Sequence, residues 1–420
     1  MGKGNNMNPA ILAIIGLILT IVMGIVLDVN CGIVAVICSF ILVQFFIPEM
    51  SLVDVYKSGW PTDTMFMMLS IMFLFGIAQA NGALEMIAKT IIRATRSKNK
   101  IMPFTFYLLA LIIAGAGAGP GIASIILPIA MTVCIQTGIK PYIMGVSVVS
   151  GAISGGLFIT SVSGVVANSL AQAVGVTNYM QIYIPYLIAM FLEVVIVYLC
   201  FGGLKIKNSG VIDTSEKLSL NAAQKKTLVV IFIVLIGILF FGLDVGMAAF
   251  TGGAILIIMK VTNEKKAISS INWNSLLLVC GVAMLIYIVK MTGGLDLITK
   301  VLVGLINENN GTAIMVLSGG LLSSVSSSIG VAMPTLIPTT ADISNSLGGT
   351  VSISALVAGV VAGANGVIYC PLSTLGALTL AAVPPEVDKK KYFNMMLFTG
   401  ISSVLFLALL GYLGWFELFI

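Results

Sequence analysis

The chain is a succession of apolar segments, each about as long as a membrane is thick. Crossing about 30 Å of hydrocarbon takes roughly 20 apolar residues in a helix. Charged residues make up only 9% of the chain and hydrophobic residues 59%, which excludes a water-soluble globule. The predicted spans are 9–28, 31–47, 63–82, 184–202, 227–243, 245–261, 273–292 and 393–416.

In lipid, backbone groups are satisfied only within helices or closed barrels. The alternating pattern of barrel strands is missing from these segments, and their lengths are those of helices. We therefore predict an all-α polytopic membrane protein.

The chain contains no histidine, which removes imidazole metal ligands, histidine proton relays and Ser-His or Cys-His nucleophile pairs. The six cysteines lie in or beside apolar stretches without a CxxC pair, which favours small core residues over disulfides or metal sites. We expect no cofactor, no metal beyond a possible Na+, and no enzymatic activity.

The sequence repeats itself. Residues 81–89 match residues 292–300 at an offset of 211, and residues 155–163 lie over residues 365–373 at nearly the same offset. The two copies are predicted as residues 1–205 and 227–420. A polar, lysine-containing linker, residues 206–226, joins them on the cytoplasmic side.

Two regions of each copy are apolar but interrupted by Gly, Ser, Pro and Asn, unlike continuous lipid-facing helices. We interpret them as a re-entrant hairpin (about 101–137 and 312–340) followed by a broken helix (about 142–175 and 352–383). Each copy then crosses the membrane five times. Because five is odd, the second copy must be inverted.

The basic residues give an independent prediction of topology, since cytoplasmic loops are enriched in Lys and Arg. With the amino terminus outside, only Lys3, Lys57 and Lys300 fall on the outer side. Sixteen fall on the cytoplasmic side: Arg93, Arg96, Lys98, Lys100, Lys140, Lys205, Lys207, Lys217, Lys225, Lys226, Lys260, Lys265, Lys266, Lys389, Lys390 and Lys391. The net charge of +5 is therefore a topological signal and not a nucleic-acid footprint. We predict a multi-pass protein of the inner or plasma membrane.

The first hairpin has the tip Ala116-Gly-Ala-Gly-Pro-Gly121. Its glycines allow close backbone approach, and Pro120 suits the first turn of the helix that follows, whose free amides face any anion. The alternative is a glycine motif for helix packing.

The second hairpin has the tip Ser323-Ser-Val-Ser-Ser-Ser-Ile-Gly330, which places hydroxyls in an otherwise oily region. A hydroxyl donates to a carboxylate or accepts from a cation, so either ligand suits this cluster. A run of serines can instead bond back along its own helix.

Inverted repeats with broken helices place a binding site near the bilayer midplane. None of the four interrupted stretches carries a charge, so an anion there would be held by helix dipoles and hydroxyls. The predicted substrate-binding residues are Gly119, Pro120, Gly121, Thr160, Ser161, Ser163, Ser324, Ser326, Ser327, Pro371, Ser373 and Thr374. The predicted cation-binding residues are Gly117, Gly155, Gly164, Asn168, Ser328 and Asn365.

Charges inside spans are expensive and are functional candidates by default. Glu193 lies mid-span, away from the breaks, and either pairs structurally or titrates during transport. Lys290 is within snorkelling reach of a span end, which favours a structural role.

Several of these motifs resemble the malonate/dicarboxylate carrier family of the ion transporter superfamily, which is related to the divalent anion/sodium symporters. In the first copy the residues concerned are 116–131, Gly138-Ile-Lys-Pro141 and Ser161-Val-Ser-Gly-Val-Val-Ala-Asn168. In the second copy, Pro371-Leu-Ser-Thr-Leu-Gly-Ala-Leu378 resembles the family's Ser-Pro-x-Ser-Thr-x-Gly-Ala motif. The resemblance implies an elevator transporter, commonly a homodimer, whose hairpin tips and broken spans bind carboxylates and coupling ions.

The leading hypothesis is secondary active transport of a small organic anion, malonate or another dicarboxylate, coupled to Na+ or H+. The alternative is an inorganic-ion transporter of the same superfamily, either a Na+/H+ antiporter or an oxyanion exporter. An integral-membrane enzyme lacks support, because no nucleophile-base or Asp-rich motif is present.

Overall fold

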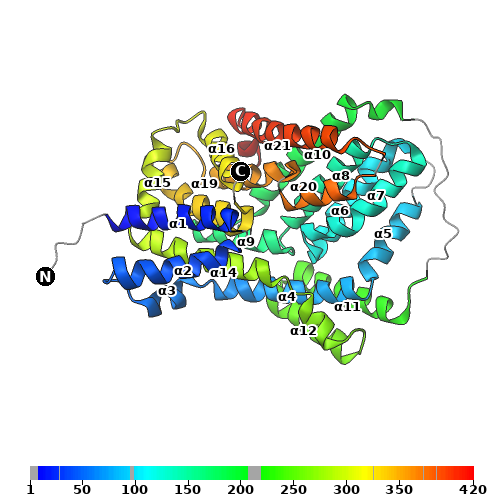
Figure 1. Cartoon of the computed structure of the whole chain (residues 1–420), viewed down its shortest axis with the longest axis horizontal. Helices are drawn as coiled ribbons and strands as arrows, with labels where there is room; N and C mark the ends of the chain where they lie inside the picture. Colours follow the sequence, from blue (N-terminus) through cyan, green and yellow to red (C-terminus); the bar gives the residue numbers. More distant parts are fainter. Residues whose placement is uncertain are drawn as a thin grey trace.

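The structure is a computed structural model that describes residues 8–27, 29–94, 99–206, 219–324, 326–371, 373–384 and 386–420. These residues form helices and connecting turns without a β-strand, which confirms the predicted all-α class. Most helix axes run along the long axis of the molecule (Figure 1). Among the basic residues used for topology, Lys3, Arg96, Lys98, Lys207 and Lys217 lie outside the described residues, and the side chain of Arg93 is not described.

The first half begins with two apolar helices and a short connecting helix, and ends with a long helix. Its helices are α1 (Pro9–Val26), α2 (Cys31–Ile41), α3 (Leu52–Gly59), α4 (Thr62–Ala80), α5 (Ala83–Ala94), α6 (Met102–Ile113), α7 (Ala123–Thr137), α8 (Pro141–Gly156), α9 (Val162–Ala173) and α10 (Met180–Cys200). Short helical turns η1 (Leu42–Phe46), η2 (Asn99–Ile101), η3 (Ala114–Ala118), η4 (Pro120–Ile122) and η5 (Gly203–Lys205) extend or join them.

The second half presents the same kinds of element in the same order. They are α11 (Ala222–Phe241), α12 (Val245–Ile258), α13 (Glu264–Ser269), α14 (Trp273–Met291), α15 (Gly294–Val303), α16 (Gly311–Ser324), η6 (Ser328–Ala332), α17 (Met333–Leu336), η7 (Ile337–Thr339), α18 (Thr340–Ser346), α19 (Ile353–Gly366), η8 (Val367–Tyr369), α20 (Thr374–Ala382), α21 (Lys389–Tyr412) and η9 (Trp415–Phe419). The arm after the second tip continues to Ser346, beyond the predicted hairpin end near residue 340.

Six helical segments of the described chain are long and apolar enough to cross a membrane: Thr62–Ala80, Asn99–Ala118, Met180–Cys200, Trp273–Met291, Ile353–Ala382 and Lys389–Tyr412. A bent pair, Gly311–Ser324 with Ser328–Ser346, adds a seventh if it counts as one span, and the chain direction bends by 119° at its break. Shorter apolar helices include α1, α2 with η1, and α12. The multi-pass membrane class is confirmed, whereas the count of five crossings per half and their inversion stay predictions.

Helices of the two halves pack in reciprocal pairs. Within the first half α6 packs against α8, and within the second half α16 packs against α19. Between the halves, α4 packs against α12 and α2 against α14. In Figure 1, α6 to α8 lie toward the right-hand end of the molecule, and α16 and α19 toward the left. The two hairpins therefore sit toward opposite ends of the bundle.

Two glycines at equivalent places allow these closest helix pairs to form. A Cβ on Gly151 of α8 would lie 2.2 Å from the Tyr107 carbonyl oxygen of α6. A Cβ on Gly363 of α19 would lie 1.9 Å from the Val316 carbonyl oxygen of α16. Both distances are far below contact distance and involve backbone, so each pair depends on a missing side chain, as small-residue interfaces in membranes do.

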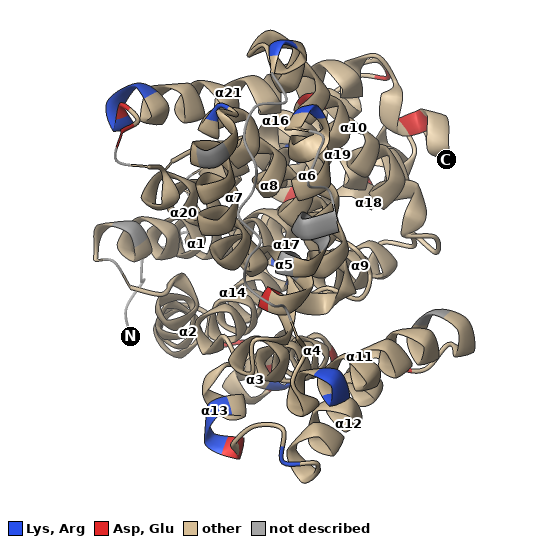
Figure 2. Cartoon of the chain, turned by 90° about the vertical axis from the view of Figure 1, so that its right-hand side faces the viewer, with Lys and Arg blue, Asp and Glu red and all other residues tan. Residues whose placement is uncertain are grey.

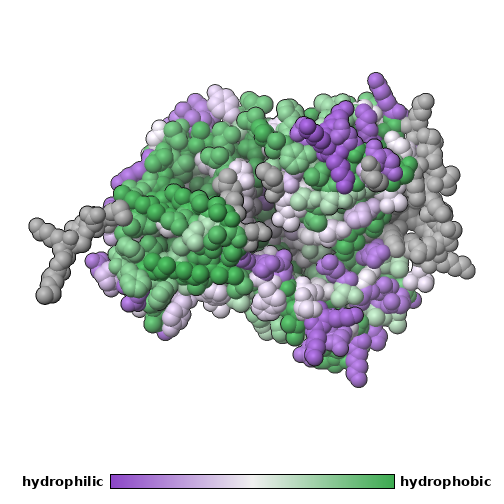
Figure 3. All heavy atoms as spheres, in the orientation of Figure 1, coloured by the Kyte–Doolittle hydropathy of each residue, from purple (hydrophilic) through white to green (hydrophobic). Residues whose placement is uncertain are grey.

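Charged and apolar surfaces are separated. Figure 2 views the molecule from the right-hand end of Figure 1 and shows basic residues at α11, at α13 and at the start of α21. Apolar side chains gather over α1 and α2 (Figure 3), where Ile18, Val22 and Phe40 are exposed. Lys290 is exposed at the end of α14, and its structural role stays a prediction.

We expect Gly151→Ala and Gly363→Ala each to lower the unfolding temperature of the purified protein, because the added methyl group forces helices apart. Overpacking of this kind costs about 1–3 kcal/mol. Gly304→Ala is the matched control, since its Cβ would stand 3.4 Å from the nearest atom at the exposed end of α15. Thermal unfolding in detergent that is equal for all three variants would contradict the packing described.

Candidate functional site

A pocket of about 520 Å3 lies where the interrupted segments of both halves meet. We call it the central pocket. Its walls come from the first tip, the second tip, both helix breaks, and the ends of α4 and α14 that face them. The lining residues are Met72, Phe75, Gly76, Gln79, Leu84, Gly117, Ala118, Gly119, Pro120, Gly121, Ile122, Ser124, Ile153, Val162, Ser163, Ser270, Asn272, Ser275, Ser328, Ile329, Asn365, Ile368, Thr374, Leu375 and Leu378.

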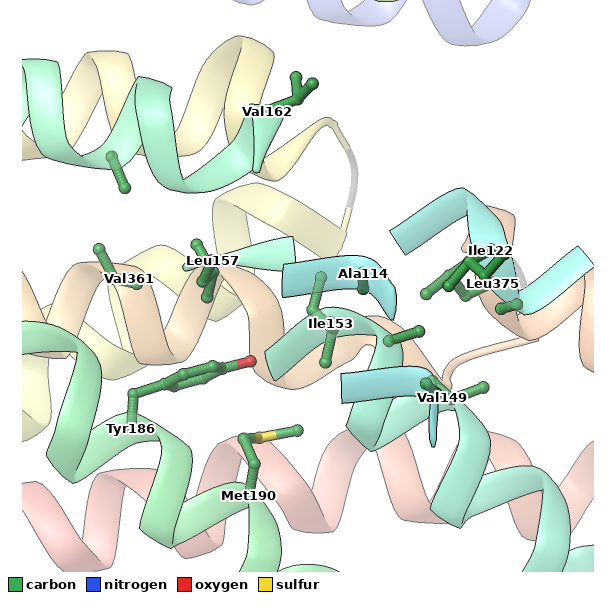
Figure 4. Packing of buried hydrophobic residues seen from close by; sticks show 14 of the residues in the cluster. Ala114, Ile122, Val149, Ile153, Leu157, Val162, Tyr186, Met190, Val361 and Leu375 are labelled. Carbon is green, nitrogen blue, oxygen red and sulfur yellow. The ribbon is translucent and has the colours of Figure 1, made fainter. Parts of the chain in front are cut away.

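The two halves contribute neighbouring residues to this wall. Ile122, just after the first tip, lies beside Leu375 in the first turn of α20 (Figure 4). The contact agrees with the packing of α20 against α7. The pocket is therefore an interface between the halves.

None of the described residues that line the pocket carries a charge. Instead, the first turns of several helices open into it: η4 leading into α7, α9 at Val162, and α20 at Thr374. Amide groups in a first helical turn lack partners within the helix, and the dipole makes this end partly positive. The arrangement suits a small anion held by backbone amides and hydroxyls.

The first tip has a backbone that only glycine adopts readily. Gly117 has φ of 125°, and a Cβ there would lie 2.2 Å from the Phe75 ring of α4. Gly119 has φ of 69° and is followed by Pro120, which starts the next helical turn as expected. The tip therefore presents bare backbone to the pocket, as its Gly-Pro-Gly sequence predicts.

The first break spans residues 157–161 between α8 and α9. The Thr160 hydroxyl donates to the Gly115 carbonyl, so a hydrogen bond connects the first break to the first tip. Ser163 lines the pocket. Ser161 stands at the N-cap of α9 but makes no side-chain cap. Its hydroxyl is buried and has no hydrogen-bond partner among the described residues.

Ser373 occupies the equivalent N-cap position of α20 in the second break. There the hydroxyl donates to the Ile368 carbonyl at 2.6 Å and accepts from the Gly376 amide at 3.1 Å. The hydroxyl of Ser373 thus makes both of its hydrogen bonds within its own break and helix, whereas the hydroxyl of Ser161 makes none with the described residues. The Ser161 hydroxyl lies beside the first tip, since a Cβ on Gly119 would be 3.9 Å from Ser161 Oγ.

The serines of the second tip behave differently from one another. The hydroxyls of Ser324 and Ser326 donate back to the carbonyls of Leu321 and Leu322, which is the self-satisfied alternative. Ser327 accepts from the Gly330 amide as a cap. Only Ser328 lines the pocket.

Ser328 connects the second tip to the second break. Its hydroxyl donates to Asn365 Oδ1 at 3.0 Å, and the Asn365 amide donates to the Val361 carbonyl at 2.8 Å. Asn365 is buried, with 2% of its surface exposed. This pair places two side-chain oxygens in the wall opposite the first tip.

The structure brings together half of the predicted site residues. Those that line the central pocket are Gly119, Pro120, Gly121, Ser163, Thr374, Gly117, Ser328 and Asn365, with Ser161 buried beside the first tip. Those that do not line it are Thr160, Ser324, Ser326, Ser327, Pro371, Ser373, Gly155, Gly164 and Asn168. Gly155 and Gly164 instead allow close packing, because a Cβ at either would lie within 2.2 Å of a backbone carbonyl.

The part of the pocket wall formed by α4 and the start of α14 was not predicted from the sequence. Gln79, Ser270, Asn272 and Ser275 line the pocket there. The signal was available, since Ser269-Ser-Ile-Asn-Trp-Asn-Ser275 is a dense polar stretch at the start of an apolar span. Gln79 by contrast looks like an ordinary residue at a span end.

Residues 7–156 match the family model described as the N-terminus of the dicarboxylate carrier protein MatC. This confirms the resemblance to dicarboxylate carriers over that part of the chain. No curated protein matches the sequence.

Two solved structures show the same fold. The Alcanivorax borkumensis YdaH transporter is 16% identical, with a TM-score of 0.60 over 87% of each chain. MtrF of Neisseria gonorrhoeae, described among antimetabolite efflux pumps, is 14% identical, with a TM-score of 0.54 over 98% of this chain and 96% of its own. Both are membrane transport proteins, and at under 25% identity they show the fold of this chain.

Ser161→Ala and Ser373→Ala form a matched pair for the difference between the two breaks. We expect Ser373→Ala to lose about 1 kcal/mol of unfolding free energy, because α20 loses its N-cap. Ser161→Ala should change stability little, since its hydroxyl has no partner to lose. Unfolding measurements on the purified variants check this, and equal losses would show that Ser161 also has a structural bond.

Proposed function

We propose that this chain is a secondary active transporter that moves a small carboxylate, malonate or another dicarboxylate, across the membrane. The observation that carries the proposal is the uncharged central pocket with the first turns of α7, α9 and α20 opening into it. In a low-dielectric site, a carboxylate is stabilised by such amide groups without a fixed arginine. The family match over residues 7–156 supports the same substrate class.

The pocket volume supports a small ligand. Small-molecule sites commonly measure about 300–1,000 Å3, and the central pocket is at the lower end at about 520 Å3. Apolar residues such as Phe75 and Ile122 limit the space between the polar groups. A short dicarboxylate with part of its hydration shell fits these limits better than a large organic acid.

The coupling ion in this proposal is Na+ or H+. Asn365 Oδ1 and the Ser328 hydroxyl supply neutral oxygen ligands of the kind that Na+ prefers, close to the predicted anion site. A cation there would also offset the charge of the substrate.

We extend the proposal to the movement of the protein. The tips, the breaks and helices α10 and α21 pack on one another and would move together as an elevator. Helices α1 to α5 and α11 to α15 would form the scaffold, and a homodimer would anchor it. The amino terminus would face outward in the inner or plasma membrane.

Counterflow in proteoliposomes tests the proposal directly. Vesicles loaded with unlabelled malonate should take up labelled malonate, with other mono- and dicarboxylates as competitors and with Na+ present or absent. Exchange of at least one dicarboxylate above that of protein-free vesicles is expected. If no acid exchanges under any ionic condition, carboxylate transport is excluded.

Asn365→Asp should lower malonate affinity at least tenfold, because it places a carboxylate in a pocket that binds anions through dipoles. Asn263→Asp is the matched control. Asn263 does not line the pocket, is exposed, and its Oδ1 accepts from the Lys265 amide at the start of α13, a cap that aspartate keeps. Concentration-dependent counterflow measures both variants. Equal affinities would place the anion elsewhere.

A further inference from the structure

Glu193 is a carboxylate buried between helices, away from the central pocket. It lies in the middle of α10 with 7% of its surface exposed. No lysine or arginine in the described part of the chain forms an ion pair with it. A charge inside a span without a counter-charge is unfavourable, and such residues serve ion or proton pathways.

Both carboxylate oxygens of Glu193 accept a hydrogen bond from a hydroxyl. Ser403 of α21 donates to Oε1 at 2.7 Å, and Tyr369 of η8 donates to Oε2 at 3.0 Å. A hydroxyl can donate to a carboxylate and accept from a carboxylic acid. The surroundings therefore accommodate Glu193 in both protonation states, which a lysine or arginine partner would not.

Tyr369 links Glu193 to the second break. It belongs to η8, directly after α19, and its hydroxyl also bonds with the Ser150 hydroxyl of α8. The preceding residue, Ile368, lines the central pocket, and its carbonyl accepts the bond from Ser373. A change in the hydrogen bond between Glu193 and Tyr369 thus acts on the backbone that shapes the pocket wall.

A row of cavities leads from Glu193 to the charged end of the molecule. The first, about 140 Å3, has room for water and is lined by Glu193, Tyr369, Thr399, Ser402 and Ser403 and by the apolar side chains Val146, Ile196, Val197 and Phe406. A small cavity of about 10 Å3 shares Tyr369 and Thr399 with it and adds Tyr142.

The row ends at a surface cavity of about 440 Å3 that Tyr142 also lines, together with Asp388, Lys390 and Lys391. The hydroxyls of Thr399 and Tyr142 are hydrogen-bonded to each other between these spaces. Each cavity thus shares a hydroxyl-bearing residue with the next, Tyr369 and Thr399 between the first two and Tyr142 between the last two.

Among the described residues, the other ionisable groups around Glu193 are tyrosines. Tyr369 faces it from η8 and Tyr186 from its own helix, with Tyr142 on α8 and Tyr392 on α21 farther along the row. Tyr186 points into the interior on the same side of α10 as Met190 (Figure 4), and its hydroxyl has no hydrogen-bond partner among the described residues. Asp388, Lys390 and Lys391 stand only at the mouth.

We propose that Glu193 is a proton-binding site, connected to the basic end of the molecule through Thr399 and Tyr142 and to the second break through Tyr369. The carboxylate takes a proton from cavity water and returns it to water, and no other bond is made or broken. Its part in transport rests on the proposed function and makes H+ the coupling ion. Tyr369 is a positioning residue that transmits the protonation state to the pocket wall.

Infrared pH titration of the purified protein tests proton binding without any substrate. Because the other Asp and Glu residues also protonate as the pH falls, the signal of Glu193 is the carboxylic-acid band in the difference between the wild type and Glu193→Gln. The exposed control Glu308→Gln should retain this band. Identical titrations of the wild type and Glu193→Gln would overturn the proposal, as would a Glu193 band that responds to Na+ and not to pH.

A second pair of variants avoids removing the carboxyl group. Ser403→Ala takes away a donor to the carboxylate, so the midpoint of the Glu193 band should move to higher pH. Ser402→Ala is the neighbouring control, because its hydroxyl donates to the Thr399 carbonyl and not to Glu193. Equal midpoints in both variants would contradict the hydrogen-bonding role assigned to Ser403.

Stopped-flow pH jumps test the route. Tyr142→Phe should slow the appearance of the Glu193 band severalfold without moving its midpoint. An unchanged rate would remove Tyr142 and Thr399 from the proposal.

Transport measurements then distinguish the coupling to protons from the movement of substrate itself. Glu193→Gln should keep malonate exchange at equal pH, within about twofold of the wild type, and lose accumulation driven by a pH gradient at least tenfold. Tyr369→Phe should change the pH profile of uptake. Full gradient-driven accumulation by Glu193→Gln would refute the coupling role. If the wild type exchanges no acid, the proposed function fails, while the infrared titration still decides whether Glu193 binds a proton.

Discussion

A helix that breaks inside a membrane leaves amide and carbonyl groups that lipid cannot satisfy. This constraint explains why the breaks after α8 and α19 and the two tips lie together: each needs the others, or a ligand, to provide partners. Thr160 satisfies the Gly115 carbonyl of the first tip, and Ser328 bonds to Asn365 of the second break. The central pocket lies between these segments, with the first turns of α7, α9 and α20 in its wall.

Close helix packing supports these breaks. Gly151 and Gly363 let α8 and α19 approach the backbone of α6 and α16, so each interrupted helix is held along its intact part. The helices on both sides of each tip are held in this way, and they keep the tips in place although the backbone of the tips is irregular. Helices α10 and α21 pack against these same helices, so Glu193 belongs to the part of the protein that contains the pocket.

Much of this arrangement follows from the sequence alone, because the membrane allows so few folds. Span lengths, the repeat and the Gly-Pro-Gly tip come from residue types whose physical meaning depends little on context. The serines were harder, since a hydroxyl has several local partners to choose from. Ser324 and Ser326 bond to their own helix, and only the structure shows that Ser328 does not. The wall formed by Gln79 and the start of α14 depends on contacts between distant segments, which no local pattern contains.

The two breaks leave the helices that follow them with different N-caps. The hydroxyl of Ser373 is engaged by its own helix, whereas that of Ser161 has no partner among the described residues. Likeness of sequence between the two copies therefore does not extend to the hydrogen bonds of their breaks, and the same side chain is structural in one copy and unengaged in the other.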